Sequence, residues 1–168
     1  MKSFVYVLLC SFVLIGTMGC KGDGSSGLET GWYYIVDVEK ENAEGTIAKK
    51  IFNSKDDKVY HLNPESIITV TNINKIEESV VFGDKKVIRM TFDDEGRQKW
   101  EDATAKYVQK YFGFILNNEL LVIRRIATKS KAGAAAVNRP DYSEEELDQL
   151  LKEMQALLPK KEMPVEKK

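Results

Sequence analysis

The chain has 168 residues, 43% of them apolar, and it carries 25 lysines and arginines against 26 aspartates and glutamates. That length is enough for one globular domain with its own core, and the formal charge of −1 removes the usual electrostatic argument for nucleic-acid binding. Both cysteines, Cys10 and Cys20, lie near the amino terminus, and His61 is the single histidine. We therefore expect no disulfide framework, no metal site and no cofactor in the body of the chain.

The first nineteen residues have the pattern of a signal peptide. Lys2 precedes an apolar run from Phe4 to Ile15, which is too short to span a bilayer but has the right length for the apolar region of a signal peptide. The glycine before Cys20 resembles the lipobox of bacterial lipoproteins, in which the cysteine thiol receives a diacylglyceryl group. Thr17 stands where leucine is commonest in that family. We expect a lipoprotein signal peptide over residues 1–19 and lipidation of Cys20; the alternative is a secreted protein cut nearby.

Residues 20–31 are predicted to be the lipidated cysteine and a flexible tether, because the segment after Cys20 is rich in glycine and serine. Acyl chains such as palmitate contribute about 0.8 kcal/mol per buried CH₂, and more than one chain gives stable attachment to a membrane. We therefore expect a protein of the cell envelope that is lipid-anchored to a bacterial membrane. Whether it faces the periplasm or the cell surface stays open.

Strand signals follow the tether. Trp32 to Val36 is aromatic and β-branched, which is typical of a strand. Further strands are predicted at Thr46–Phe52, at Val59–Leu62 ahead of Pro64 and at Ile67–Thr71, with a loop at Asn53–Lys58. Residues 72–79 fit no single pattern. Two apolar runs, Val80–Phe82 and Val87–Phe92, predict a hairpin.

A helix is predicted to follow Asp93, which is a favoured N-cap residue. Apolar and small residues at helical spacing predict its buried face: Trp100, Ala103, Thr104, Tyr107, Val108 and Tyr111. A second hairpin joins Phe114–Leu116 to Leu120–Ile123 through Asn117-Asn118, because asparagine tolerates a positive φ.

The remaining chain predicts one more helix. Residues 127–142 indicate no clear element, since they combine small side chains with Pro140. Ser143 to Glu146 is a capping box, and the helix that it opens ends before Pro159. Residues 159–168 are predicted to be a disordered charged tail. The whole order predicts a single α+β domain over residues 32–158: an antiparallel sheet with two main helices packed on one face, preceded by additional N-terminal strands.

Four local patterns follow one another over residues 87–152. They are an F-x-x-x-G pattern at Phe92 and Gly96, an Ala-Thr pair at 103–104, the hairpin at 114–121, and a glycine loop before the capped helix that starts at Ser143. Together they resemble the head subdomain of the first periplasmic domain of the SecD/SecF protein-export membrane protein. Arg124-Arg125 departs from that family, which has a proline after the hairpin, and Cys20 stands in place of the family's membrane anchor.

The resemblance implies a non-enzymatic role that faces a polypeptide. In that family the head subdomain contacts translocating polypeptide during proton-driven export and catalyses no reaction. We therefore expect a protein or polypeptide partner, with an accessory role in export or envelope assembly. This expectation rests on analogy, since one fold serves many functions.

Candidate partner-binding residues come from two parts of the chain. A basic patch, formed by Arg124, Arg125, Lys129 and Lys131, borders a small-residue loop around Gly133, whose backbone is little hindered and could take up a partner strand. The second part is the strand at 32–36. Its side chains alternate, so Tyr33 points away from its aromatic neighbours and one side of the strand could present an exposed ring to a partner.

Two alternatives involve no protein partner. An envelope hydrolase would have to be centred on His61, and it would need a nucleophile or carboxylate beside that ring. A small-ligand-binding lipoprotein would need a mostly apolar pocket of some hundreds of Å³. The acidic clusters at Asp93–Glu95 and Glu144–Glu146 are explained by the favourable charge of helix N-termini, so they indicate neither catalysis nor metal binding.

Overall fold

The computed structural model describes residues 27–41, 45–49, 58–81, 83 and 85–159. The predicted signal peptide, Cys20, most of the tether, the loop at 53–57 and nearly all of the charged tail lie outside the described residues. The elements, in chain order, are β1 Gly31–Val36, α1 Val38–Glu41, β2 Thr46–Lys49, β3 Val59–Thr69, the 3₁₀ helix η1 Val70–Asn72, β4 Ile73–Val81, β5 Lys85–Phe92, α2 Asp94–Lys106, β6 Tyr111–Leu116, β7 Glu119–Arg125, β8 Ala134–Val137 and α3 Glu144–Ala156.

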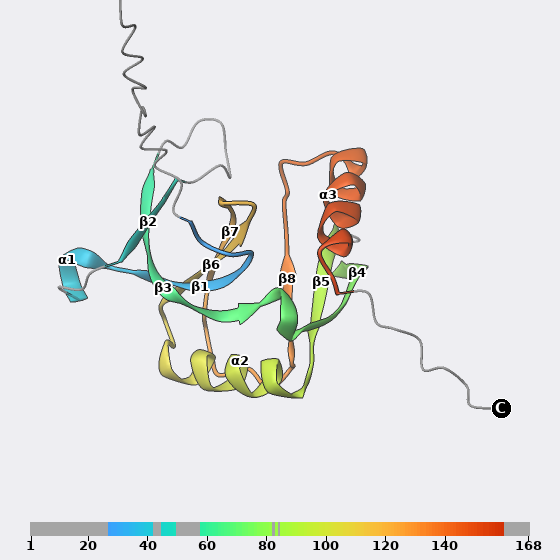
Figure 1. Cartoon of the computed structure of the whole chain (residues 1–168). Coiled ribbons are helices and arrows are strands. Elements are labelled where there is room, and N and C mark those ends of the chain that lie inside the picture. The colour runs from blue at the N-terminus through green and yellow to red at the C-terminus, as the bar shows by residue number, and fades with distance from the viewer. Residues whose placement is uncertain (1–26, 42–44, 50–57, 82, 84, 160–168) are drawn as a thin grey trace, which may run out of the picture.

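The described strands form two antiparallel sheets (Figure 1). One has five strands in the order β2-β3-β1-β6-β7, and the other has three in the order β4-β5-β8. The predicted α+β class, with antiparallel pairing and two main helices, is confirmed. The strands are divided between two sheets, where the sequence pattern placed them in one, because η1 redirects the chain between β3 and β4.

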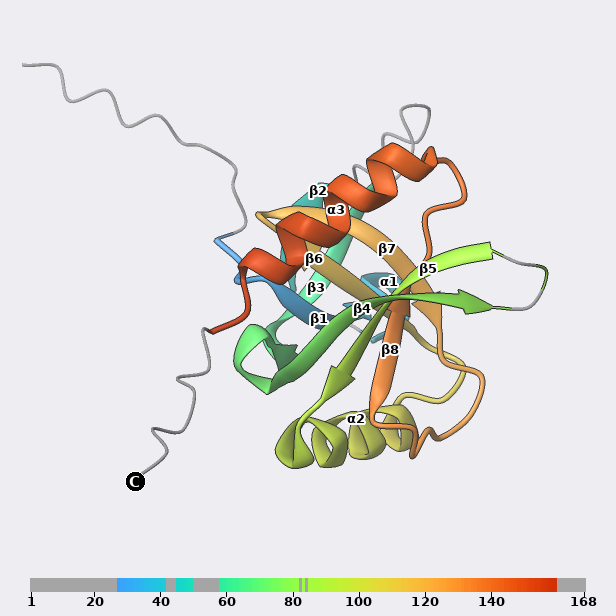
Figure 2. The ribbon, with the colours of Figure 1, turned by 90° about the vertical axis from the view of Figure 1, so that its right-hand side faces the viewer.

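The two main helices contact different strands. Helix α2 contacts β3 and β5 and so touches both sheets, whereas α3 contacts β4 and β5 of the three-stranded sheet. In Figure 2, α3 crosses the upper half of the view and α2 lies at the bottom. The helices therefore close two sides of the space between the sheets.

Aromatic side chains fill the main core. Trp32 of β1 is fully buried, and its ring centroid lies 5.4 Å from that of Trp100 on α2 and 5.3 Å from that of Phe114 on β6. Such edge-on and tilted pairs add to the free energy gained by burying the rings. Helix α3 contributes Leu147, Leu150 and Met154 to the same cluster. The core thus joins both sheets and both helices into one domain.

The five-stranded sheet is also buried on its other side. A smaller cluster there comprises Leu28, Tyr33, Leu62, Ile115 and Leu120. Strands β2 and β7, which are the two edges of this sheet, contact each other. The sheet therefore curls around the smaller cluster, and neither side of β1 is left open to solvent.

The structure confirms the predicted start of α2 and corrects its end. The Asp93 carboxylate accepts a hydrogen bond from the Gly96 N–H at 2.7 Å, as an N-cap should. The helix ends at Lys106, and Gln109 with a φ of 67° turns the chain into β6. Val108 and Tyr111 are therefore 40% and 48% exposed, and do not belong to the buried helix face that the spacing predicted.

The two other strong local signals are also confirmed. Asn117 and Asn118 have φ values of 49° and 66° and join β6 to β7 in a tight turn. At the start of α3, Ser143 accepts a hydrogen bond from the Glu146 N–H, and the Glu146 carboxylate accepts one from the Ser143 N–H. Both arrangements depend only on residues that are close in sequence.

Strand β3 is one strand of 11 residues, although Pro64 was predicted to separate two. The register with β1 jumps between the pairs Tyr33–Ser66 and Ile35–Leu62, so Pro64 falls in an irregular part of the ladder. Strand β2 pairs with β3 only as far as Leu62. A proline is tolerated at such a bulge because no ladder hydrogen bond needs its missing N–H.

Candidate functional site

The basic patch and the small-residue loop lie together at one place in the fold. Arg124 and Arg125 end β7, Lys129 and Lys131 follow in the connecting loop, and Gly133 immediately precedes β8. Strands β7 and β8 are edge strands of different sheets. The predicted residues therefore border the space where the two sheets approach each other.

Tyr33 does not lie there. It is 2% exposed and belongs to the smaller core cluster, and its hydroxyl donates a hydrogen bond to the Glu29 carbonyl at 2.8 Å. Burial raises the pKa of the Tyr33 hydroxyl. Because both sides of β1 are covered, the ring faces the interior rather than solvent.

Gly133 shapes the entry to β8. Its φ is 58°, and its carbonyl accepts a hydrogen bond from the Phe92 N–H at 2.9 Å. A Cβ at this position would lie 2.9 Å from Nε of Arg97, so a side chain would have to displace that arginine. Gly133 is itself buried, and its place indicates a role in starting the strand.

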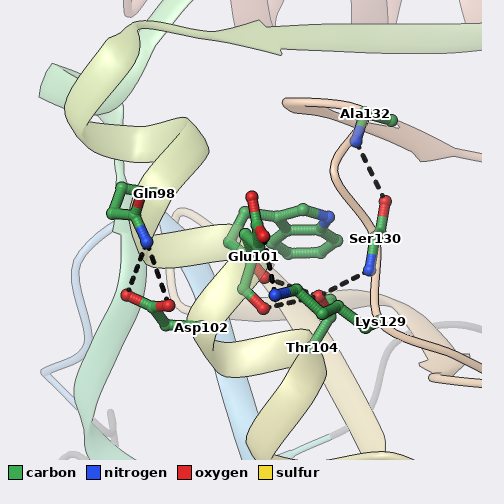
Figure 3. Close-up of polar contacts among 8 residues, drawn as sticks. Gln98, Glu101, Asp102, Thr104, Lys129, Ser130 and Ala132 are labelled. Carbon is green, nitrogen blue, oxygen red and sulfur yellow. Dashed lines mark hydrogen bonds and ion pairs between the residues drawn. The ribbon is translucent and has the colours of Figure 1, made fainter.

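An ion pair and a hydrogen bond join the loop before β8 to α2 (Figure 3). The Lys129 ammonium pairs with the Glu101 carboxylate at 2.7 Å, and the Ser130 N–H donates to the Thr104 hydroxyl at 2.9 Å. That buried hydroxyl in turn donates to the Trp100 carbonyl at 2.8 Å. Of the two predicted loop lysines, Lys129 is thus engaged with the protein, and Lys131 is exposed.

Three adjoining hollows form a groove between β7 and β8. Their volumes are about 230, 310 and 440 Å³, and Arg124 lines all three. We call this the β7–β8 groove and define it by the residues that shape its walls: Val81, Val87, Arg89, Val122, Ile123, Arg124, Ala134 and Ala136. The hollows are also lined by Arg125 and by the polar residues Ser79, Thr104, Thr128, Ser130 and Asn138.

Two arginine side chains of the groove have no ion-pair partner among the described residues. Arg89 and Arg124 are both exposed, and within the described part of the chain neither side chain makes an ion pair or hydrogen bond. Glu77 lies opposite Arg89 in the β4–β5 register, but its carboxylate pairs with the Lys75 ammonium. Among the described residues, no aspartate or glutamate lines any of the three hollows. By contrast, Arg125 donates a hydrogen bond to the Gln109 side chain. The arrangement can therefore hold a negatively charged, elongated ligand.

Sequence reasoning found Arg124 but missed Arg89 and Val81. The alternation along residues 87–92 put Arg89 on the side of the strand opposite Ile88 and Met90, and that was the available signal. Nothing in the sequence shows that the same side faces β7, because residues 89 and 124 approach only when both sheets are in place.

A second cavity, of about 520 Å³, lies at the carboxyl end of β1, and His61 is one of the residues that line it. Tyr60, Tyr111 and Val59 line it together with charged residues of α1 and its flanks. The Lys40 ammonium lies 2.9 Å from the Asp37 carboxylate and, by hydrogen bonding to it, lowers the pKa of Asp37. The His61 imidazole makes no hydrogen bond or ion pair with any described residue. We name this the His61 cavity.

The described residues contain neither a metal-binding cluster nor a membrane-spanning helix. No three histidine, cysteine, aspartate or glutamate side chains come together in a way that could hold a metal ion. No helix among these residues is long and apolar enough to cross a membrane.

Comparison with known proteins points to one family. The model of the SecDF P1 head subdomain matches residues 48–156. A SecDF crystal structure in a super-membrane-facing form has a TM-score of 0.56 at 16% identity, covering 74% of this chain and 18% of that one. SecDF described as a membrane component that enhances protein export has a TM-score of 0.56 at 14% identity, covering 77% and 64%. SecDF from Thermus thermophilus, a translocon-associated membrane protein, has a TM-score of 0.52 at 17% identity, covering 78% and 20%.

The similarity to these solved structures concerns the fold and covers only part of each of them. Identities below one fifth show a shared fold alone, and the chain spans less than two thirds of each of the three solved chains. No curated protein matches. The family match begins in β2 and ends with α3, so it contains both walls of the β7–β8 groove. It extends the resemblance over residues 87–152 toward the amino terminus.

Proposed function

Because the chain belongs to the family of SecDF P1 head subdomains, we propose that it is a non-catalytic module that binds polypeptide at the bacterial cell envelope. One solved relative is described as enhancing protein export, which favours an accessory role in export or envelope assembly here. Lipidation of Cys20 would hold the domain at a membrane through its tether.

The observation that carries this proposal is the β7–β8 groove. It runs along β8 beside the edge strand of a second sheet, and the family match covers both sides of it. Extended polypeptide is recognised in other proteins by edge strands together with nearby side-chain pockets. The described residues also bring no second titratable group into hydrogen-bonding contact with His61, so the geometry favours binding over catalysis.

The proposal is tested by equilibrium binding of the full-length, lipidated protein in detergent micelles. The probe is a reduced and alkylated polypeptide that stays unfolded, and its control is the same polypeptide folded by its disulfides. We expect saturable binding of the unfolded form, with a dissociation constant in about the micromolar range, and no binding of the folded form.

Equal binding of both forms, or of neither, would contradict the proposal. Val81, in the groove wall, and Gln149, exposed on α3, give a matched pair of neutral positions for a charge substitution. Val81→Glu places a negative charge beside the probe site and is expected to weaken binding, whereas Gln149→Glu leaves it unchanged. His61→Ala is also expected to leave polypeptide binding unchanged.

The His61 cavity supports a second candidate function, the binding of a small ligand. Its volume of about 520 Å³ falls within the size of known ligand sites, and it combines aromatic, apolar and charged groups. A thermal-shift screen of small amphipathic molecules would detect such binding. A hit that stabilises the wild type but not Tyr111→Ala would place the ligand there, and a screen without hits would count against this candidate.

A further inference from the structure

Strand β8 has one edge that no described strand occupies. It pairs with β5 alone, in the register Met90–Ala135 and Arg89–Ala136. In an antiparallel ladder, every second residue of a strand forms hydrogen bonds with its neighbour. Since the Gly133 carbonyl accepts a hydrogen bond from the Phe92 N–H, the odd-numbered residues of β8 are those that bond to β5. The N–H and C=O groups of Ala134 and Ala136 therefore point away from β5, toward the groove.

The side chains around this edge are arranged for a charged partner. Arg89 and Ala136 lie opposite each other across β5 and β8, on the same side of the sheet. Because the Ala136 methyl is short, the Arg89 side chain has room to extend across β8. Arg124 lines the same hollow from the side of β7. An added strand beside β8 would be the fourth of this sheet and would lie about 4.8 Å from β8, between the two guanidinium groups.

We propose that the β7–β8 groove binds an extended acidic segment of polypeptide by strand addition to the open edge of β8. This inference rests on the proposed function and names the kind of polypeptide. The added strand would accept and donate hydrogen bonds with Ala134 and Ala136. A carboxylate opposite Ala136 would meet both Arg89 and Arg124, for which the groove itself supplies no acidic side chain.

The charge complementarity gives a direct reason for preferring an acidic occupant. Two exposed arginines without an ion-pair partner among the described residues repel a basic segment and attract a carboxylate. The alanines of β8 leave space above the strand, so the occupant can carry long side chains there. A neutral apolar strand would satisfy the backbone but leave both guanidinium groups unpaired.

The test uses capped eight-residue peptides and the full-length protein. One peptide alternates glutamate with valine, since valine favours an extended backbone. A second replaces every glutamate by glutamine. Two further versions of the glutamate peptide are N-methylated on the backbone: one at the glutamate nitrogens and the other at the valine nitrogens. We expect the glutamate peptide to bind about tenfold more tightly than the glutamine peptide, with the preference falling as salt is raised.

Two protein variants distinguish the effect of Arg124 on binding from the effect of the protein's net charge. Arg124→Gln is expected to weaken the glutamate peptide about fivefold and the glutamine peptide by less than twofold. Lys152→Gln removes the same charge from the exposed side of α3 and is expected to change neither. In strand addition only one set of backbone nitrogens faces β8, so methylation of that set abolishes binding and methylation of the other does not.

Three results would overturn the inference. They are equal affinity for the glutamate and glutamine peptides, equal effects of Arg124→Gln and Lys152→Gln, and indifference to both methylation patterns. Absence of binding by every peptide would overturn it too. If the unfolded polypeptide still binds in any of these cases, the proposed function stands and only the acidic strand is rejected. Loss of both activities rejects both statements.

Discussion

Arg139 connects the two sheets through its own side chain. It follows β8 and is only 3% exposed, and it donates a hydrogen bond to the Leu121 carbonyl of β7 at 3.2 Å. Its guanidinium also forms two hydrogen bonds with Asp141, at 3.1 and 2.8 Å, and lies 4.0 Å from the Tyr142 ring centroid. A planar, fork-shaped cation can make all these contacts at once, which lysine cannot.

Replacing this arginine is expected to destabilise the domain. Arg139→Met keeps much of the buried volume but leaves the Leu121 carbonyl and the Asp141 carboxylate without their donor, at a cost of about 2–3 kcal/mol. Urea unfolding of the variant measures the loss. Lys152→Met, at an exposed site, is the control and should change stability by less than about 0.5 kcal/mol. Similar midpoints for the two variants would show that Arg139 does not join the sheets.

The same ion pair predicts how stability responds to acid. Hydrogen bonding from Arg139 lowers the pKa of Asp141 below its ordinary value of 3.8. A carboxyl whose pKa is lower in the folded protein adds stability that is present above 3.8 and is lost as pH falls through the lowered pKa. Asp141→Asn lacks this contribution. The wild type and the variant should therefore differ in unfolding free energy at about pH 6, and this difference should be smaller at about pH 3. The same difference at both pH values would contradict a lowered pKa of Asp141.

Among the elements, the β6–β7 hairpin offers a sharp test of turn chemistry. Asn118 has a φ of 66°, a conformation that is easy for glycine and strained for a β-branched residue. Asn118→Gly should leave the melting temperature unchanged or raise it slightly. Asn118→Val should lower stability by about 1–2 kcal/mol. Equal melting temperatures for the two variants would mean that the turn does not hold this conformation in solution.

The elements that sequence reasoning found are those specified by neighbouring residues. The Asp93 cap, the Asn117-Asn118 turn and the capping box at Ser143 are local arrangements, and each is confirmed. Strand β8 is different, since Ala134–Val137 has a low intrinsic preference for a strand and becomes one through its register with β5. Pro64 likewise was read as the end of a strand because the bulge that accommodates it depends on β1.

At the scale of the whole molecule, the β7–β8 groove is a product of the division into two sheets. Its walls come from residues near 80, 89, 124 and 135, which are distant in sequence and meet only in the folded domain. The sequence could indicate Arg124 as part of a basic patch, and it could place Arg89 on the outer side of a strand. It could not indicate that the two share one hollow, because that depends on how η1 and α2 redirect the chain.

The expected lipid anchor can be tested on the intact protein with the two cysteines as a matched pair. Cys20→Ser removes the predicted acceptor thiol, so the protein should leave the membrane fraction and its amino terminus should lack added lipid mass. Cys10→Ser changes the predicted signal peptide only and should leave the mature protein lipidated. Membrane fractionation and mass spectrometry of the mature protein measure both effects. An unchanged membrane fraction for Cys20→Ser would contradict lipidation at this residue.

The most direct test of polypeptide binding at the groove is site-specific photo-crosslinking of the full-length protein to the unfolded polypeptide probe. A photoreactive phenylalanine replaces Val81 in the groove, Val59 in the His61 cavity, or Lys152 on α3; the two valines are similarly accessible, at 42% and 56% exposed. If the polypeptide binds in the groove, Val81 gives a crosslinked product with the unfolded probe alone, and the other two positions give little. No product from Val81, or a stronger one from Val59, would contradict binding in the groove.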